Sequence, residues 1–204
     1  MYSLKTIHRN YTSELKELNQ IMDRLSVVPK SYERDIFIQG TFLRCVIIWE
    51  NFIEESFLAA MCGCKTNSNT ILKPIGAKSK NKEQAFKKLS VNRRLRESDY
   101  LDWIDSSQIK NRILENFHHR SRFHQIYRDT GILNQIKAIR NHIAHNSKQT
   151  NKKFTEQIIQ TNGYLAIPDP NAAEILIATN RQHQKAFYKL YIDYYEETAN
   201  EICK

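Results

Sequence analysis

Apolar residues recur at spacings of three and four along the chain from Leu4 to Leu25. That spacing places them on one side of a helix, so the pattern predicts an amphipathic α-helix over residues 4–26. The following segment, 33–62, is apolar on nearly every side, which is typical of a helix at the centre of a bundle. Gly63 comes directly after this segment and is expected to cap its carboxyl end.

Further helical segments follow a long polar connection that contains Pro74 and Gly76. Ser98 and Asp99 are residue types that cap helix amino ends, and both precede an apolar periodic stretch. An isoleucine stripe in the second half of the chain and an aromatic-rich stripe near its end also have the helical period. The expected helices are 81–91, 98–116, 121–145 and 181–203.

One segment departs from the helical pattern. Asn162-Gly163 separates two short apolar runs, 154–160 and 164–167, and this arrangement is the strongest short-range signal for a β-hairpin. We therefore predict an all-α, up-and-down helical bundle that forms a single domain over the 204 residues. The small β-hairpin is expected as an insertion at about 153–170, before the last helix.

Composition narrows the class of protein. The chain is 41% apolar and has only 5 glycines in 204 residues, so it can bury a core and does not resemble a disordered or collagen-like chain. Its longest uninterrupted apolar run, 57–62, is far shorter than the roughly 18 residues of a membrane span. Four cysteines are too few for a disulfide scaffold. We expect a cytoplasmic protein with no membrane partner.

The charge of the chain is strongly positive. Lys and Arg number 31 against 22 Asp and Glu, and this net charge of +9 suits a polyanionic partner such as nucleic acid. The excess is concentrated between residues 78 and 96, where eight cationic residues accompany one glutamate. A solvated helix face would have the same composition, so RNA binding is one of two readings of this strip. The residues expected to contact phosphate are Lys87, Lys88, Arg93 and Arg94.

The segment from Ile136 to Ser147 contains groups suited to phosphodiester chemistry. Within it, Arg140, Asn141 and His145 fall inside six residues. An imidazole can take the proton from a ribose 2′-hydroxyl, and a guanidinium can stabilise charge on the phosphate oxygens. A carboxamide can hold either the phosphate or the imidazole. Arg and His also occur near helix ends as surface cations favoured by the helix dipole, and the spacing alone leaves that alternative open.

The two principal side chains of this segment do not share a helix face. On an ideal helix Arg140 and His145 lie about 140° apart. Two arrangements would bring both to one phosphate: the helix loosens near Ala144, or a second copy of the chain completes the site. His142 precedes His145 by three residues, but no further ligand nearby completes a metal site, so no metal is expected. His142 is instead expected to line the cleft and contact RNA.

Two carboxylates interrupt the apolar helix at 33–62. Glu50 and Glu54 fall in the middle of one apolar face, where a carboxylate is costly unless it is paired or faces a cleft. They either bridge to an Arg or Lys of a neighbouring helix for structural reasons, or Glu50 orients Arg140 or His145. The sequence contains no nucleotide-binding loop or dinucleotide fingerprint, so no cofactor is expected.

The sequence Arg-Asn-His-Ile-Ala-His at 140–145 resembles the Arg-x(4–6)-His motif of the HEPN superfamily, in its common form with Asn after Arg. The long early helix with Trp49-Glu50-Asn51-Phe52 also fits this family. The resemblance covers the helical parts of the chain and implies an all-α bundle. Many members are metal-independent endoribonucleases of toxin–antitoxin and other defence systems. They usually work as dimers whose motif helices meet in one cleft.

For this chain, the resemblance implies that Arg140 and His145 are catalytic and that Asn141 supports them. Ser147 stands where a subgroup of the family has a tyrosine that a partner transferase modifies, so that regulation is not expected here. The expected function is a toxin-like or anti-phage endoribonuclease that cleaves RNA by 2′-OH transphosphorylation. Its expected partners are RNA, a second copy and a cognate antitoxin or inhibitor protein. The alternatives are a catalytically silent HEPN-type module that binds RNA, nucleotide or a partner, and a dimeric helical adaptor.

Overall fold

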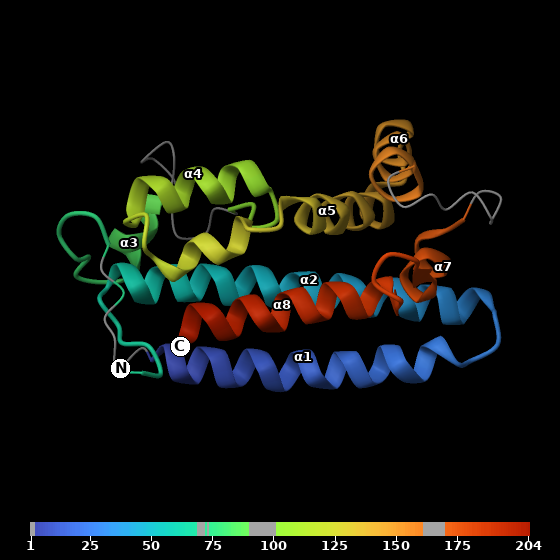
Figure 1. Ribbon diagram of the computed structural model, residues 1–204, viewed down its shortest axis with the longest axis horizontal. Helices are drawn as coiled ribbons and strands as arrows, with labels where there is room; N and C mark the ends of the chain where they lie inside the picture. Colours follow the sequence, from blue (N-terminus) through green and yellow to red (C-terminus); the bar gives the residue numbers. More distant parts are fainter. Residues whose placement is uncertain (1–2, 69–71, 73, 90–100, 161–169) are drawn as a thin grey trace. The chain divides into compact units, whose positions relative to one another are not determined.

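The computed structural model shows a mostly helical chain, which confirms the all-α prediction (Figure 1). It describes residues 3–68, 72, 74–89, 101–160 and 170–204. The elements in these ranges are α1 (Leu4–Ser26), α2 (Tyr32–Met61), α3 (Lys82–Leu89), α4 (Ser106–Asn116), the 3₁₀ helix η1 (Arg122–Tyr127), α5 (Thr130–His145), α6 (Lys148–Phe154), the π-helix η2 (Thr155–Gln160), α7 (Ala172–Ile177), β1 (Thr179–Asn180), β2 (Lys185–Ala186) and α8 (Phe187–Cys203).

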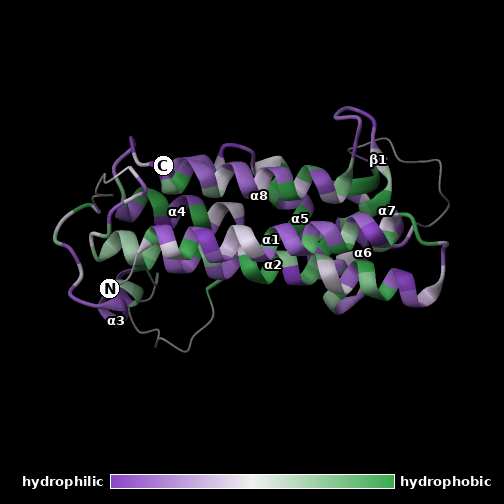
Figure 2. Cartoon of the chain, turned by 90° about the horizontal axis from the view of Figure 1, so that it is seen from below, coloured by the Kyte–Doolittle hydropathy of each residue, from purple (hydrophilic) through white to green (hydrophobic). Residues whose placement is uncertain are grey.

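The first two helices have the bounds that the hydrophobic pattern predicted, to within one residue. Hydrophilic and hydrophobic residues alternate along α1, as expected for an amphipathic helix (Figure 2). Its apolar stripe is buried at Leu4, Leu15 and Met22. The predicted cap at the end of α2 is also confirmed. The amide of Cys64 donates to the carbonyl of Ala59 at 3.0 Å, a hydrogen bond characteristic of the Schellman motif.

Of the two glycines in α2 and its cap, Gly63 is expected to be the one at which substitution by alanine lowers stability. Its φ of +78° lies in the left-handed region, so Gly63→Ala should lower the free energy of unfolding by about 1–2 kcal/mol. Gly40, inside α2, is the matched control, because an added Cβ there meets nothing within 4 Å. Gly40→Ala should raise the free energy of unfolding by about 0.5–1 kcal/mol. Denaturant titration of both variants measures the two effects, and equal effects would contradict the assigned cap.

The expected burial of α2 on all sides is wrong for its part up to Ile47. Ile36, Phe37 and Ile47 are 48%, 63% and 46% exposed. By length and composition, α2 also qualifies as a helix that could cross a membrane, although its longest uninterrupted apolar run is short. Half of the qualifying window is buried within the protein, and a buried core helix passes the same test. That the chain has no membrane partner therefore stays a prediction.

Three predicted helices begin later than expected, and the last of them, predicted at 181–203, begins at Phe187. The helix predicted at 98–116 begins at Ser106, because Asp105 caps it by accepting from the amides of Ser107 and Gln108. The side chain of Asp102 likewise accepts from the backbone amides of Ile104 and Asp105. These bonds hold the residues before the helix in a turn. The predicted caps Ser98 and Asp99 lie outside the described residues. The helix predicted at 121–145 is divided into η1 and α5.

The first strand of the predicted hairpin is wrong, because residues 154–160 are helical. Ser147 and Thr150 form a capping box that starts α6, and this local signal overrides the strand-like composition. Phe154 and Ile158 are both buried at a spacing of four, which is a helical spacing. The second predicted strand, 164–167, lies outside the described residues. An antiparallel pair of two-residue strands, β1 and β2, occurs instead directly before α8.

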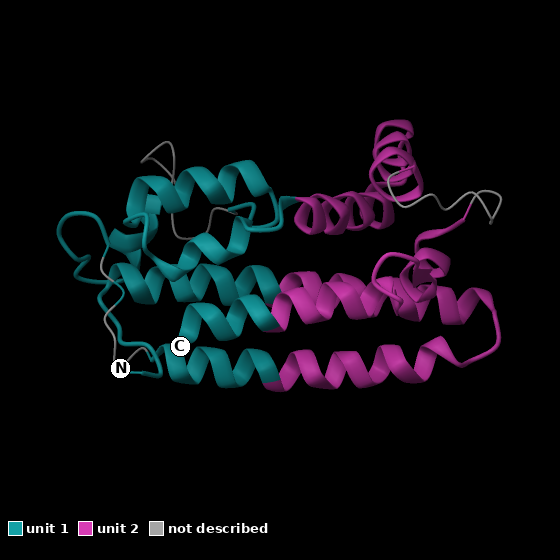
Figure 3. Cartoon of the chain, viewed as in Figure 1, with its two compact units in different colours: residues 1–12, 49–130, 197–204 teal, residues 13–48, 131–196 magenta. Residues whose placement is uncertain are grey.

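The chain forms two compact units, and α1, α2 and α8 contribute residues to both (Figure 3). Unit 1 comprises 1–12, 49–130 and 197–204, and unit 2 comprises 13–48 and 131–196. The core of unit 1 is rich in aromatic rings. The ring of Phe57 lies 4.3 Å from that of Phe123 and 4.9 Å from that of Trp103, measured between centroids.

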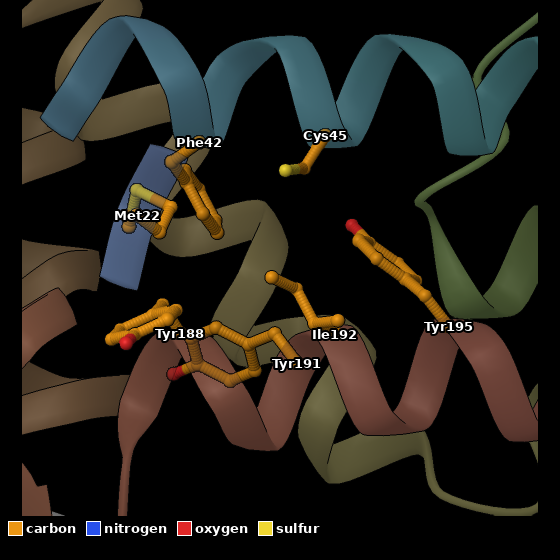
Figure 4. Close-up of a pocket in the computed structure, with 7 residues that line it drawn as sticks. All are labelled: Met22, Phe42, Cys45, Tyr188, Tyr191, Ile192 and Tyr195. Atoms are coloured by element: carbon orange, nitrogen blue, oxygen red, sulfur yellow. The ribbon is translucent and has the colours of Figure 1, made fainter. Parts of the chain in front are cut away.

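The core of unit 2 includes a small apolar pocket between α1, α2 and α8 (Figure 4). Burial raises the pKa of Cys45, which lines this pocket, to about 12, so its thiol stays protonated at neutral pH. The hydroxyl of Tyr188 donates to Asp23 at 2.5 Å and that of Tyr191 donates to Gln135 at 3.1 Å. The bond from Tyr188 lowers the pKa of Asp23. The pocket is part of the core packing and presents no reactive group.

Candidate functional site

The Arg–His segment lies where α5 meets α6, both in unit 2. Asn146 has a φ of +39°, in the left-handed region that Asn tolerates better than most residues. Its amide donates to the carbonyl of His142 at 3.0 Å, which closes the last turn of α5. Ser147 then caps α6. We call this junction, residues 140–154, the α5–α6 elbow.

Arg140 is half-buried and is oriented by its neighbour in the chain. Its Nη1 donates to Oδ1 of Asn141 at 2.9 Å. Across the part of the chain that the structure describes, no carboxylate lies within ion-pair distance of the Arg140 guanidinium. Asn141 therefore fixes the guanidinium through a neutral oxygen and leaves its charge available to an anion.

His145 is the last residue of α5 and is exposed to solvent. Its imidazole has no hydrogen-bond partner among the described residues. Because α5 is helical through Ala144, the helix does not loosen there, and the first of the two arrangements expected from the sequence is wrong. Arg140 and His145 therefore remain about 140° apart around a regular helix. A second copy of the chain that completes the site stays a prediction.

His142, on α5, contacts two residues of α6. Its ring stacks on that of Phe154 with centroids 4.2 Å apart and an interplanar angle of 7°. Its Nδ1 lies 2.8 Å from Oδ1 of Asn151. Both contacts are with α6, so His142 helps to hold α6 against α5, and its expected contact with RNA stays a prediction. Sequence analysis missed this role, because the expected strand at 154–160 hid the helical position of Phe154.

Glu50 and Glu54 bind the same tryptophan in unit 1. Oε1 of Glu50 accepts from the backbone N–H of Trp103 at 3.4 Å, and Oε2 of Glu54 accepts from its indole N–H at 2.8 Å. Arg112 also contacts this tryptophan, with its guanidinium carbon 4.9 Å from the centroid of the Trp103 ring. Both hydrogen bonds give the carboxylates a structural role, but the partner in these two bonds is a tryptophan outside the helices and not the expected Arg or Lys of a neighbouring helix. Orientation of Arg140 or His145 by Glu50 stays a prediction, since these residues belong to different units.

Two lysines of the predicted RNA-binding strip have partners within the chain. Nζ of Lys87 donates to Glu83 at 2.6 Å, and Nζ of Lys88 donates to the carbonyl of Ala77 at 2.8 Å. Arg93 and Arg94 lie outside the described residues. The strip therefore offers fewer uncommitted cations than its composition indicated, and its contact with RNA stays a prediction.

No three His, Cys, Asp or Glu side chains group as metal ligands in the described ranges. The groups that the α5–α6 elbow offers to a ligand are thus a guanidinium, a carboxamide, an imidazole and nearby lysines. Comparison with known protein families, with curated proteins and with solved structures finds no match for this chain. The resemblance to the HEPN superfamily rests on the motif at 140–145, on its position at the end of α5 and on the long early helix with Trp49-Glu50-Asn51-Phe52.

Proposed function

We propose that this protein is a metal-independent endoribonuclease whose active site is built on the α5–α6 elbow. One observation carries the proposal. The half-buried Arg140 is oriented by Asn141, has no carboxylate partner among the described residues, and lies five residues before an exposed histidine. A guanidinium that is held in place but not neutralised is suited to stabilise a phosphate on which negative charge develops.

The proposed reaction is an internal transphosphorylation. The imidazole of His145 takes the proton from a ribose 2′-hydroxyl, and the 2′-oxygen forms a bond to the adjacent phosphorus. The bond from phosphorus to the 5′-oxygen breaks, and that oxygen takes a proton from an imidazolium. The products carry a 2′,3′-cyclic phosphate and a 5′-hydroxyl. Arg140 stabilises the charge on the equatorial phosphate oxygens, and Asn141 keeps the guanidinium in position.

The geometry of α5 favours a site shared between two copies. Arg140 and His145 of one chain point in directions about 140° apart, so one phosphate cannot easily meet both. In a twofold dimer, Arg140 of one copy can face His145 of the other. We therefore propose a homodimer with the paired elbows around one RNA-binding cleft.

The resemblance to the HEPN superfamily supports a role as a toxin-like or anti-phage effector, with a cognate antitoxin or inhibitor protein as a further partner. Expression of the wild-type chain should then arrest growth, and expression of His145→Ala should not. A chain that binds RNA without cleaving it would instead fit the catalytically silent binding module.

RNA cleavage in the presence of EDTA tests the proposed function. Purified wild-type protein should cleave single-stranded RNA and leave 2′,3′-cyclic phosphate ends, detectable by their resistance to ligation. His145→Ala should be inactive, whereas His183→Ala is the matched control, because His183 is an exposed histidine on the β1–β2 turn. Abolition of cleavage by EDTA, or full activity of His145→Ala, would contradict the mechanism.

A further inference from the structure

The α5–α6 elbow lies in a stretch of chain without acidic residues. From residue 130 to residue 155 there is no Asp or Glu, although the whole chain has 22 of them in 204 residues. The same stretch carries five cationic side chains. These are Lys137, Arg140, Lys148, Lys152 and Lys153. The absence of acids, rather than a high density of cations, distinguishes this surface from the strip at 78–96.

Three of these cations are on α6, directly beyond His145. Lys148, Lys152 and Lys153 are all exposed, and the Lys152 side chain is 77% exposed. Lys148 and Lys153 form no ion pair with any described residue, and Lys152 approaches Glu156 only to 3.8 Å. In contrast, Lys87 and Lys88 on α3 already bind oxygens of the chain. The ammonium groups of α6 are therefore the better placed to bind an external anion.

The position of these lysines relative to the proposed active site is fixed within unit 2. His142 stacks on Phe154 and bonds to Asn151, so α6 is attached to the same helix that carries Arg140 and His145. Lys148 and Lys152 are four residues apart, and one helical turn separates them by about 6 Å along the axis. That spacing is comparable with the separation of neighbouring phosphates in an extended RNA strand.

We propose that Lys148, Lys152 and Lys153 bind the phosphates that neighbour the cleaved one, so that the substrate is single-stranded RNA of several nucleotides. This inference rests on the proposed function. In-line attack by the 2′-hydroxyl needs it opposite the leaving 5′-oxygen, and an A-form duplex does not offer that geometry. Unstacked single strands do, and their backbone is the part that lysines contact without sequence preference.

A binding experiment tests the lysines without any need for cleavage. The probe is a fluorescent twelve-nucleotide RNA with 2′-O-methyl groups, measured by anisotropy over a series of salt concentrations. The triple variant Lys148→Gln/Lys152→Gln/Lys153→Gln should bind about tenfold more weakly, and its logarithmic salt slope should fall by about two, at roughly 0.7 per lost phosphate contact. The charge-matched control is Lys5→Gln/Lys16→Gln/Lys65→Gln, three exposed lysines of unit 1 and α1. It should retain the wild-type slope.

A cleavage experiment separates this inference from the proposed function. A ribodinucleotide with one phosphate reaches Arg140 and His145 but has no neighbouring phosphate for α6. In the α6 triple variant, kcat/KM for the twelve-nucleotide RNA should fall about tenfold more than kcat/KM for the dinucleotide. Equal losses on both substrates would overturn the inference and leave the proposed function standing.

The remaining outcomes also decide between the two proposals. If the wild-type protein cleaves neither substrate, the proposed function fails, and the anisotropy series still reports whether α6 binds RNA. If the salt slope of the α6 variant equals that of the control variant, the lysines do not bind RNA phosphates. The triple variant Lys82→Gln/Lys87→Gln/Lys88→Gln removes the lysines of α3. If this variant alone bound the RNA more weakly, RNA binding would belong to α3, and the inference would be overturned.

Discussion

Replacing His145 with alanine should reduce the rate of RNA cleavage by about 10²–10⁴-fold, which is the usual contribution of a group that transfers a proton. RNA affinity should change little, because one exposed imidazole contributes less to binding than the cations of the elbow. Single-turnover cleavage measures the rate, and anisotropy with a non-cleavable RNA measures the affinity. Parallel loss of rate and affinity in His145→Ala, with an unchanged fold, would assign the histidine to binding instead.

Arg140 should contribute both to RNA affinity and to the cleavage rate, in contrast to His145. Arg140→Ala removes a charge that meets the phosphate in the ground state and more strongly in the transition state, so both affinity and rate should fall. Arg140→Lys should restore affinity more than rate, because an ammonium cannot reproduce the planar fork of a guanidinium.

Asn141 provides a sharper test of how Arg140 is held. Asn141→Asp keeps the size of the side chain but replaces the neutral oxygen that accepts from Nη1 with a carboxylate. The new ion pair should compete with the phosphate for the guanidinium and lower the rate further than Asn141→Ala does. If Asn141→Asp were the more active of the two, the arrangement of Arg140 and Asn141 would have no part in catalysis.

Local sequence signals predicted the elements that local interactions determine. The bounds of α1 and α2 follow from hydrophobic spacing, and the Gly63 cap follows from one residue type at one position. The helix expected from residue 98 starts at Ser106, because the side chains of Asp102 and Asp105 accept from nearby amides and hold the preceding turn. Such competition depends on the conformation itself and is not visible in the apolar pattern.

Local signals in the sequence also predicted some features of the candidate site and missed others. Arg140, Asn141 and His145 are close in the chain, so the sequence could predict that they act together. The contacts of His142 with Phe154 and of Glu50 with Trp103 join residues that are distant in the sequence or separated by a misassigned element. The hairpin prediction at 153–170 rested on Asn162-Gly163 between two apolar runs, whereas the Ser147 capping box starts a helical segment that includes residues 154–160.

Mixing two inactive variants should restore activity if the active site is shared. In a mixed dimer of Arg140→Ala and His145→Ala, one site lacks both groups, and the other combines an intact Arg140 with an intact His145 from different copies. Random pairing of equal amounts gives mixed dimers in half of the population, each with one of two sites intact. Cleavage should therefore recover to about one quarter of the wild-type rate in a twofold dimer.

The same experiment separates a shared site from a site within one chain. If Arg140 and His145 of a single copy act together, each variant lacks one essential group and no mixture recovers activity. The regular helix through His145, with the two side chains about 140° apart, makes the shared arrangement the expected one. A mixture of Arg140→Ala with Arg140→Ala/His145→Ala is the matched control and should remain inactive, because no copy supplies the guanidinium. Recovery in that control would show that cleavage does not depend on Arg140 at all.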